Sequence, residues 1–285
     1  MGVVLITGCS SGFGLETALA FAANGDTVIA TMRNVERARV LNERAAAAGL
    51  EIETLALDVS SDASVTTTVQ DVLTRHGGID VLVNNAGVGH MGAVETMNLD
   101  LAREVLDTNF WGTVRMIQAV LPHMRAKDDG VIINVSSIAG RIPPLPFSSW
   151  YAVSKHGVGL LSEALLMELM GTGVRVVSIE PGFFKTSINI NASPPASTDV
   201  YAQEVVWVGR FYYLGVKDGG DPTDVAAAIV SAATNPATPL HVTVPTELEE
   251  MANPRPAVPF EVTAAQQIEL LEAVIGPRPT RGVEG

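Results

Sequence analysis

Apolar residues fall into six short runs along the first two-thirds of the chain, separated by helix-length segments. The runs cover residues 3–7, 27–31, 51–57, 80–84, 130–136 and 174–180. Most are apolar without alternation, as in strands buried on both faces, and the intervening segments are long enough for crossover helices. The pattern therefore predicts an α/β fold, a doubly wound, Rossmann-like parallel sheet in three layers, with a single domain over residues 1–285.

Local signals place two of the helices. An apolar stripe in residues 11–24 predicts a helix that Gly25 ends. Asp221 and Pro222 are typical of the cap and the first position of a second helix.

The regular alternation ends after Pro181. Residues 183–220 are rich in aromatic side chains and predict an irregular insertion that binds substrate, although ordinary core packing explains them equally well. Residues 236–285 predict a C-terminal extension. Its six prolines within 236–259 indicate a surface connector, and the spacing of Ile268, Leu271 and Ile275 predicts a short helix that packs on its own subunit or on a partner.

Composition narrows the classes of function. The chain of 285 residues is 47% hydrophobic and carries 31 acidic against 18 basic residues, a net charge of -13. This charge argues against binding to nucleic acid or to a membrane surface. The single cysteine, Cys9, excludes an internal disulfide and suits a reducing compartment. No apolar run approaches the ~20 residues of a membrane span, and no basic segment precedes the first strand, so we expect a cytoplasmic protein. We also expect no metal site.

The stretch "TGCSSGFG" lies between the first predicted strand and the first helix. Gly8, Gly12 and Gly14 allow a tight turn and a close approach of the backbone to a pyrophosphate, which would face the amides of the helix N-terminus. A tight turn without a ligand is the alternative interpretation. The predicted cofactor site includes the intervening residues Ser10, Ser11 and Phe13.

The end of the second strand bears on the choice of cofactor. NAD sites of this kind have an acidic residue at the carboxyl end of that strand. Asp26 lies at the wrong end, whereas Thr31 occupies the acidic position and Arg33 follows it. An arginine without a carboxylate suits the 2′-phosphate, to which Ser11 could also donate, so we expect NADP(H) to be preferred over NAD(H). Arg33 as a solvated surface charge remains the alternative.

Two tyrosine–lysine pairs have the same spacing, Tyr151 with Lys155 and Tyr213 with Lys217. Only the first follows a buried strand that ends in serine, and it begins a segment with helical periodicity, so both side chains share one helix face. Half-ionisation of a phenol at pH 7 requires a pKa shift of about 3 units, or about 4 kcal/mol. A unit charge about 4 Å away at an effective dielectric constant near 20 supplies that amount. We therefore predict that Tyr151 and Lys155 are catalytic and that the second pair is a coincidence.

The chain resembles the short-chain dehydrogenase/reductase family, single-domain subgroup, through "TGxxxGxG" at 7–14, "NNAG" at 84–87, "YxxxK" at 151–155 and "PGFFKT" at 181–186. The resemblance implies catalytic roles for Asn109, Ser137, Tyr151 and Lys155. Asn109 would hold a helix distortion and a proton relay, Ser137 would bind the substrate carbonyl, and Lys155 would bind the nicotinamide ribose and lower the pKa of Tyr151. Further cofactor contacts are implied for Asp58, Val59, Asn85, Ala86, Gly87, Tyr151, Lys155, Pro181, Gly182, Phe184 and Thr186.

The serine position departs from the family pattern. The family usually has its serine 13 residues before the tyrosine, where this chain has Ile138, whereas Ser137 is 14 residues before Tyr151. The loop with Pro143 and Pro144 would absorb the extra residue. Ser136 is a weaker candidate, because alternation along the strand would point it away from the site.

A narrower similarity, in "VLITGCSSGFG" and "VIATMRN", is to 17-beta-hydroxysteroid and retinol dehydrogenases. With the aromatic segment after Pro181, it implies hydride transfer between NADP(H) and a small-molecule carbonyl or secondary alcohol, expected to be bulky and apolar. Leu145, Phe147, Phe183, Ser137 and Tyr151 would line the substrate pocket. Two alternatives remain open, a catalytically silent NADP-binding sensor or interaction protein and an epimerase or dehydratase that recycles its cofactor. The family also implies a homodimer or homotetramer, although the C-terminal extension is unusual for the standard tetramer.

Overall fold

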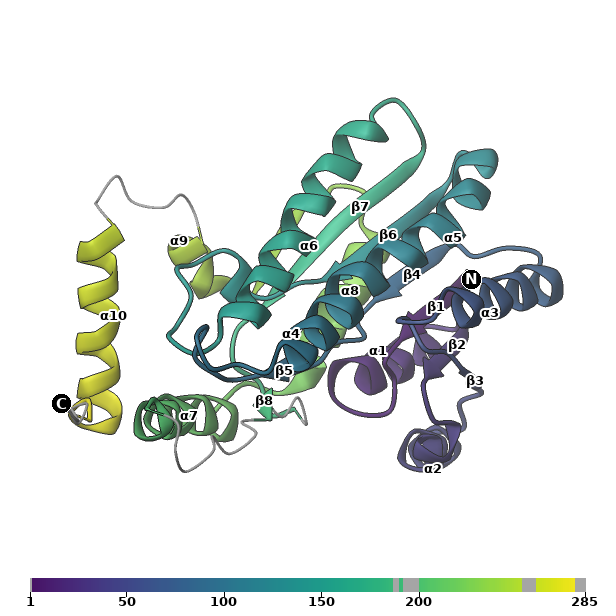
Figure 1. Ribbon diagram of the computed structural model, residues 1–285. Coiled ribbons are helices and arrows are strands. Elements are labelled where there is room, and N and C mark those ends of the chain that lie inside the picture. Colours follow the sequence, from purple (N-terminus) through teal and green to yellow (C-terminus); the bar gives the residue numbers. More distant parts are fainter. Residues whose placement is uncertain (1, 187–189, 192–199, 253–259, 280–285) are drawn as a thin grey trace.

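Seven strands form one parallel sheet in the computed structural model, which describes residues 2–186, 190–191, 200–252 and 260–279 (Figure 1). The strand order is β3-β2-β1-β4-β6-β7-β9. The strands are β1 Val3–Thr7, β2 Thr27–Met32, β3 Glu53–Ala56, β4 Val81–Asn84, β6 Gly130–Val135, β7 Val174–Pro181 and β9 His241–Val244, and β5 Gly89–His90 pairs separately with β8 Ile190–Asn191. All six runs predicted from the sequence form strands of this sheet, so the predicted α/β fold is confirmed.

Helices cover both faces of the sheet and make the three layers (Figure 1). On β1, Val4 and Ile6 pack with α1 and α8, whereas Leu5 packs on the opposite face with α3, α5 and α6. Strands buried on both faces read as continuous apolar runs, which explains why these strands were predictable. The helices are α1 Gly12–Ala23, α2 Arg39–Ala47, α3 Asp62–His76, α4 Leu99–Leu106, α5 Gly112–Lys127, α6 Ser149–Glu168, α7 Ala202–Lys217, α8 Pro222–Thr234, α9 Glu249–Ala252 and α10 Phe260–Ile275.

The two predicted helix starts are confirmed. The helix α1 follows Ser11, and Gly25 comes just after its end with a positive φ of 89°. The side chain of Asp221 caps α8 by accepting a hydrogen bond from the backbone N–H of Thr223, and Pro222 is the first helical residue.

Two expectations for the second half of the chain are wrong. The proline-rich stretch 236–259 is not only a connector, because residues 241–244 form β9 and extend the sheet beside β7. The segment around Tyr213 is not irregular, because it forms the 16-residue helix α7. This helix buries residues at helical spacing, among them Val205, Val208 and Tyr212.

The helix α10 packs against α7 at one side of the molecule (Figure 1). Leu271 and Ile275 of α10 are buried in a small apolar cluster with Val208 and Trp207 of α7. The indole N–H of Trp207 also donates to the carbonyl of Gly276, just past α10.

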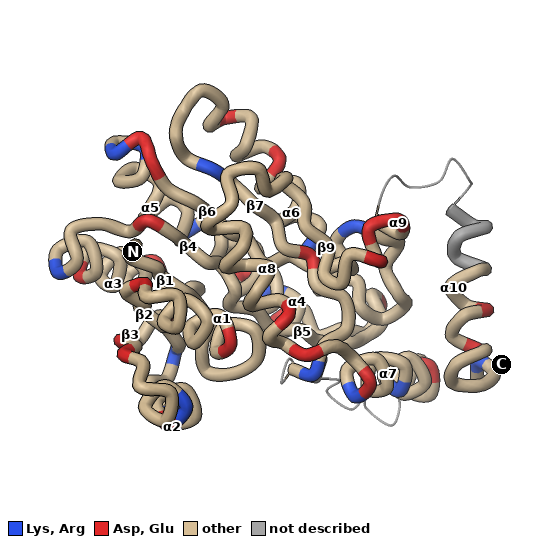
Figure 2. Tube along the Cα trace, turned by 180° about the vertical axis from the view of Figure 1, so that it is seen from behind, with Lys and Arg blue, Asp and Glu red and all other residues tan. Residues whose placement is uncertain are grey.

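Charged residues of both signs are interspersed along the described part of the chain (Figure 2). None of the helices within the described ranges is long and apolar enough to cross a membrane. Among those same residues, no group of three or more His, Cys, Asp and Glu side chains could hold a metal ion. Cys9 is a buried free cysteine.

Candidate functional site

The glycine loop between β1 and α1 is shaped by contacts that only glycine permits. Gly8 and Gly12 have positive φ angles of 75° and 58°. A Cβ on Gly14 would lie 2.4 Å from the carbonyl oxygen of Gly8. Asn85, which follows β4, donates from its side-chain amide to the carbonyl oxygens of Thr7 (2.8 Å) and Gly8 (3.1 Å). The sequence motifs at 7–14 and 84–87 are therefore joined in space, with the amides of the first turn of α1 next to the loop.

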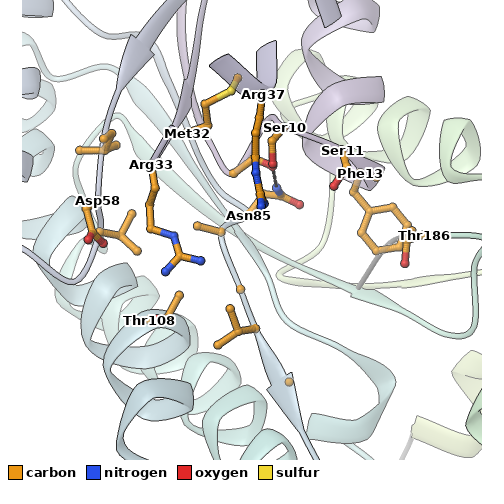
Figure 3. A pocket seen from close by; sticks show the side chains of 18 of the residues that line it. Ser10, Ser11, Phe13, Met32, Arg33, Arg37, Asp58, Asn85, Thr108 and Thr186 are labelled. Carbon is orange, nitrogen blue, oxygen red and sulfur yellow. Dashed lines mark hydrogen bonds between the residues drawn. The ribbon is translucent and has the colours of Figure 1, made fainter. Parts of the chain in front are cut away.

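This loop borders a cleft of about 470 Å³ at the carboxyl ends of the strands. Most of the predicted cofactor residues line it: Gly8, Ser10, Ser11, Gly12, Phe13, Arg33, Asp58, Val59, Asn85, Ala86, Gly87 and Thr186. Figure 3 shows their side chains around the cleft. Gly14 does not line the cleft, because it packs directly beneath Gly8.

Arg33 and Arg37 extend their guanidinium groups into the cleft from just beyond β2 (Figure 3). Arg37 was missed, although it stands four residues after Arg33 and belongs to the short 3₁₀ helix Val35–Ala38. The assignment of Thr31 to the acidic position is wrong. Thr31 is buried and donates to the carbonyl oxygen of Ile6, and by strand alternation Met32 lines the cleft instead.

Three other polar side chains of the cleft, His90, Glu104 and Thr108, were also missed. His90 Nε2 lies 3.2 Å from Glu104 Oε2. The signal in the sequence was weak, because His90 is three residues past the "NNAG" motif and its partner comes from α4.

Asn109 lies in a π-helical turn, Asp107–Trp111, between α4 and α5. Its side chain is buried, accepts from the backbone N–H of Val88 (2.8 Å), and donates to the carbonyl of Val88 (2.9 Å) and to Ser154 Oγ (3.0 Å). Asn109 therefore joins the loop after β4 to α6. Gly87 is close to this junction, since a Cβ there would lie 3.3 Å from Asn109 Oδ1 and 3.6 Å from Lys155 Nζ.

Tyr151 and Lys155 begin α6 and share one face of that helix. Lys155 Nζ lies 5.8 Å from the centre of the Tyr151 ring and donates to the carbonyl oxygen of Val135 (2.8 Å). Ser137 lines the same pocket as Tyr151, and its hydroxyl donates to the carbonyl oxygen of Pro181 (3.4 Å) and accepts from the backbone N–H of Ala139 (3.1 Å). Ser136 instead donates to the carbonyl oxygen of Lys155. The structure thus brings Ser137, Tyr151 and Lys155 together.

The electrostatics of this group differ from the expectation. Burial raises the pKa of Tyr151, and the nearby Ser137 side chain offsets part of that rise. Burial also lowers the pKa of Lys155 to about 8, because this residue is only 4% exposed. Within the protein chain, Lys155 does not lower the pKa of Tyr151 below its usual value. Its ammonium is directed at a carbonyl, and desolvation of the phenol outweighs the attraction.

A second pocket of about 120 Å³ adjoins the cleft and shares Phe13, Asn85 and Thr186 with it. Its lining includes Ser137, Tyr151 and Lys155 together with Leu145, Pro181, Gly182, Phe183, Phe184 and Tyr212. Phe147 does not line it. This residue has a positive φ of 63° and packs near Tyr201 outside the pocket.

The second tyrosine–lysine pair lies elsewhere. Tyr213 is 66% exposed on the outer face of α7, Lys217 is exposed too, and neither residue lines either pocket. Context in the sequence therefore separated a pair beside the cleft from a surface pair of identical spacing.

The features of the cleft suit a dinucleotide. A glycine cradle that a Cβ would fill, helix amides beside it and two cationic side chains at the far end match a pyrophosphate and a further phosphate. The apolar pocket with a phenol and a hydroxyl at its base suits a carbonyl or alcohol group.

Comparisons with known proteins agree with this geometry. The family described as short chain dehydrogenase matches residues 2–196. The chain is 37% identical over 239 residues to "Uncharacterized oxidoreductase YusZ" of Bacillus subtilis, which covers 81% of this chain and 84% of the relative. It is 34% identical over 252 residues to retinol dehydrogenase 8 of Homo sapiens, covering 83% of this chain and 79% of the relative.

Solved structures show the same fold. A short-chain dehydrogenase from Streptomyces avermitilis aligns over 95% of both chains with a TM-score of 0.76 and 32% identity. A metagenomic short-chain oxidoreductase in complex with NADP aligns over 85% of this chain and 96% of its own, with a TM-score of 0.69 and 29% identity.

Proposed function

This chain belongs to the short-chain dehydrogenase family of oxidoreductases, and from that premise we propose that it transfers hydride between NADP(H) and an apolar ketone or secondary alcohol. One observation carries the proposal. Ser137, Tyr151 and Lys155 together line an apolar pocket that adjoins a cleft suited to a dinucleotide.

The residues that would hold the cofactor come from four segments. The glycine loop and the first turn of α1 would bind the pyrophosphate, Asp58 the adenine, and the segment 85–87 the middle of the cleft. Pro181, Gly182, Phe184 and Thr186 would border the nicotinamide. When bound, the cofactor supplies or accepts the hydride.

The protein's own groups would handle the proton. In the reductive direction Tyr151 gives its phenolic proton to the substrate oxygen while Ser137 donates a hydrogen bond to that oxygen. Lys155 then returns a proton to Tyr151, for which a pKa of about 8 is well matched at neutral pH. Asn109 holds the loop and α6 together, and we propose that it also supports the proton path to Lys155.

The preference for NADP(H) is supported by Arg33 and Arg37, two cations at the end of the cleft where the adenosine ribose would lie. The neighbouring NADP complex is in line with this preference. The ratio of kcat/KM for NADPH and NADH tests it, and a higher value for NADH would refute it.

The pocket sets the substrate class. Its lining is mainly apolar, and the similarity to retinol dehydrogenase 8 fits an apolar substrate. Its volume of about 120 Å³ accommodates the reacting carbon and a compact substituent. A bulky substrate would therefore place its larger part outside the described walls.

We also propose that the protein forms a homodimer or homotetramer and is located in the cytoplasm. The outer face of α6 exposes Val153, Leu160 and Met167, apolar side chains that a second subunit would cover. Size-exclusion chromatography with light scattering measures the oligomer.

The decisive experiment is an NADPH oxidation screen over steroid, aryl and aliphatic ketones, followed by Tyr151→Phe on any substrate found. We expect Tyr151→Phe to abolish turnover and to retain NADPH binding, whereas the matched variant Tyr213→Phe keeps full activity. A fully active Tyr151→Phe variant would refute the mechanism. Net consumption of NADPH excludes an epimerase or dehydratase that recycles its cofactor, and NADPH binding without turnover of any ketone favours the silent sensor.

A further inference from the structure

Glu180, near the end of β7, is a buried carboxylate outside both pockets. Its two oxygens each lie 3.2 Å from Arg141 Nη1, and Oε1 lies 2.6 Å from His241 Nδ1 on β9. Ser178 Oγ donates to the same carboxylate at 3.3 Å. The far nitrogen of His241 lies 3.2 Å from Glu163, whose carboxylate is exposed. Glu180 is therefore the centre of a charged cluster that joins β7, β9 and the loop after β6.

Arg141 ends the segment that carries the catalytic serine of the proposed reaction. We call residues 136–141 the serine turn. Ser137 caps its 3₁₀ helix, and the backbone N–H of Arg141 donates to Ile138 at its other end. The guanidinium also donates to the carbonyl of Ala252 in α9 (3.4 Å). Through Arg141, Glu180 holds the outer end of the serine turn.

Helix α6 contacts the serine turn near both of its ends. Ser136 Oγ donates to the carbonyl of Lys155 (2.7 Å), and His156 Nδ1 lies 2.6 Å from the carbonyl oxygen of Gly140. A Cβ on Gly140 would lie 2.8 Å from the backbone carbonyl of Lys155, so this contact leaves no room to move inward. The pair Arg141–Glu180 is the corresponding restraint from the side of β7.

A buried ion pair is a costly way to stabilise a fold, because desolvation of both charges consumes most of their attraction. A packed apolar pair would stabilise as well or better. What the ion pair adds is direction, because both oxygens of the Glu180 carboxylate lie 3.2 Å from one guanidinium nitrogen, Arg141 Nη1, and so fix where that nitrogen lies. Glu180 also directly precedes Pro181, whose carbonyl accepts the hydrogen bond of Ser137. The segment Glu180–Pro181 therefore contacts the serine turn at two points, at Arg141 through the Glu180 carboxylate and at Ser137 through the Pro181 carbonyl.

We propose that Glu180 is a positioning residue that acts through Arg141 to keep Ser137 in its place beside Tyr151 in the pocket. The inference rests on the proposed function in that Ser137 and Tyr151 are the reacting groups it serves. The placement of Ser137 beside Tyr151 can be tested without turnover.

Tyrosine NMR tests whether Ser137 keeps its place beside Tyr151. The chain has only four tyrosines, so ¹³Cζ labelling gives four signals, and Tyr151→Phe identifies the one that reports on this phenol. Ser137→Ala gives the chemical shift of that signal when the Ser137 hydroxyl is absent. We expect Glu180→Gln and Arg141→Met to move the signal of Tyr151 toward that chemical shift. Glu163→Gln, which alters the same cluster at its exposed end without touching Arg141, should leave it in place.

The folded state is checked by circular dichroism, since either single variant breaks the ion pair between Arg141 and Glu180. If a single variant does not fold, the double variant Glu180→Gln/Arg141→Met removes both charges, and the same displacement is expected. An unmoved Tyr151 signal in a folded variant overturns the inference, whatever the activity of the enzyme. A displaced signal supports it even if no ketone is turned over, so its failure and that of the proposed function are distinguishable.

Kinetics with any ketone found in the screen gives the second readout. Misplacement of a reacting group lowers kcat steeply, so we expect Glu180→Gln to lower kcat on the order of tenfold or more. The Kd for NADPH should change less than about twofold, because Glu180 does not line the cleft. Arg141→Lys, which keeps the charge, should recover part of the kcat lost in Arg141→Met. Equal losses in kcat and in NADPH affinity would indicate general damage and overturn the positioning role.

Discussion

Lys155 should destabilise the folded protein at neutral pH. Burial lowers its pKa to about 8 in the folded chain, from the 10.5 of an exposed lysine. Each pKa unit corresponds to about 1.4 kcal/mol of difference between the two states, so 2.5 units amount to about 3 kcal/mol. Folding below pH 8 therefore carries the cost of holding this charge away from water.

The sign of the pH dependence follows from proton binding. Between pH 8 and 10.5 the unfolded chain keeps the proton on Lys155 while the folded chain has lost it. The unfolded state then binds more protons, so the free energy of unfolding rises with pH across this window. The contribution from Lys155 should grow by about 2 kcal/mol between pH 7 and pH 9.5 and reach its full value above pH 10.5.

Lys155→Met removes this contribution and keeps an unbranched side chain of similar length. Urea unfolding of the wild type and the variant at several pH values from 7 to 9.5 gives both free energies. The wild type should gain about 2 kcal/mol on the variant over this range. Loss of the hydrogen bond to Val135 shifts the difference by a constant amount and does not change its slope.

Lys217→Met is the matched control, because Lys217 has the same spacing to a tyrosine but is exposed on α7. Its difference from the wild type should not vary with pH in this window. A stability difference for Lys155→Met that stays constant from pH 7 to 9.5 would refute the buried charge and the proton-return role built on it.

Three further predictions concern other parts of the molecule. Arg37→Ala should raise the KM for NADPH by roughly 10- to 150-fold, the equivalent of about 1.5–3 kcal/mol for a charge-assisted hydrogen bond, with a smaller change for NADH; equal changes would contradict the phosphate role. Gly14→Ala places a Cβ 2.4 Å from the Gly8 carbonyl oxygen, so NADPH binding by fluorescence and the Tm should both fall, whereas Gly159→Ala, with no atom within 4 Å of the added Cβ, should be tolerated. Leu271→Ala should destabilise the α7–α10 contact by about 2–5 kcal/mol, seen as faster amide exchange in α10, while Leu270→Ala on the exposed side should change exchange little.

The strands that could be predicted from the sequence are those whose apolar residues stand next to one another in the chain. Strands β1, β4 and β6 are apolar on both faces, so each reads as a short continuous run. Strand β9 was not predicted, because "HVTV" lies among prolines at the edge of the sheet and only its last two residues are buried. Helix α7 was not predicted, because its aromatic and β-branched residues weaken the helical signal in the sequence. Its stability comes instead from packing against α10 and the wall of the pocket.

The residues of the candidate site divide in the same way. Gly8, Asn85 and Tyr151 stand in contiguous motifs, so sequence alone could place each beside the others once the strand order was assumed. Phe147 could not be excluded from the pocket in advance, because its orientation depends on a positive φ in the loop before α6. The serine turn shows the limit most clearly. Nothing near Glu180 in the sequence indicates that its partners are 39 residues before it and 61 residues after it. Contacts between residues so far apart exist only after the sheet has formed, and this is why a positioning role for Glu180 becomes testable from the structure and not from the motif.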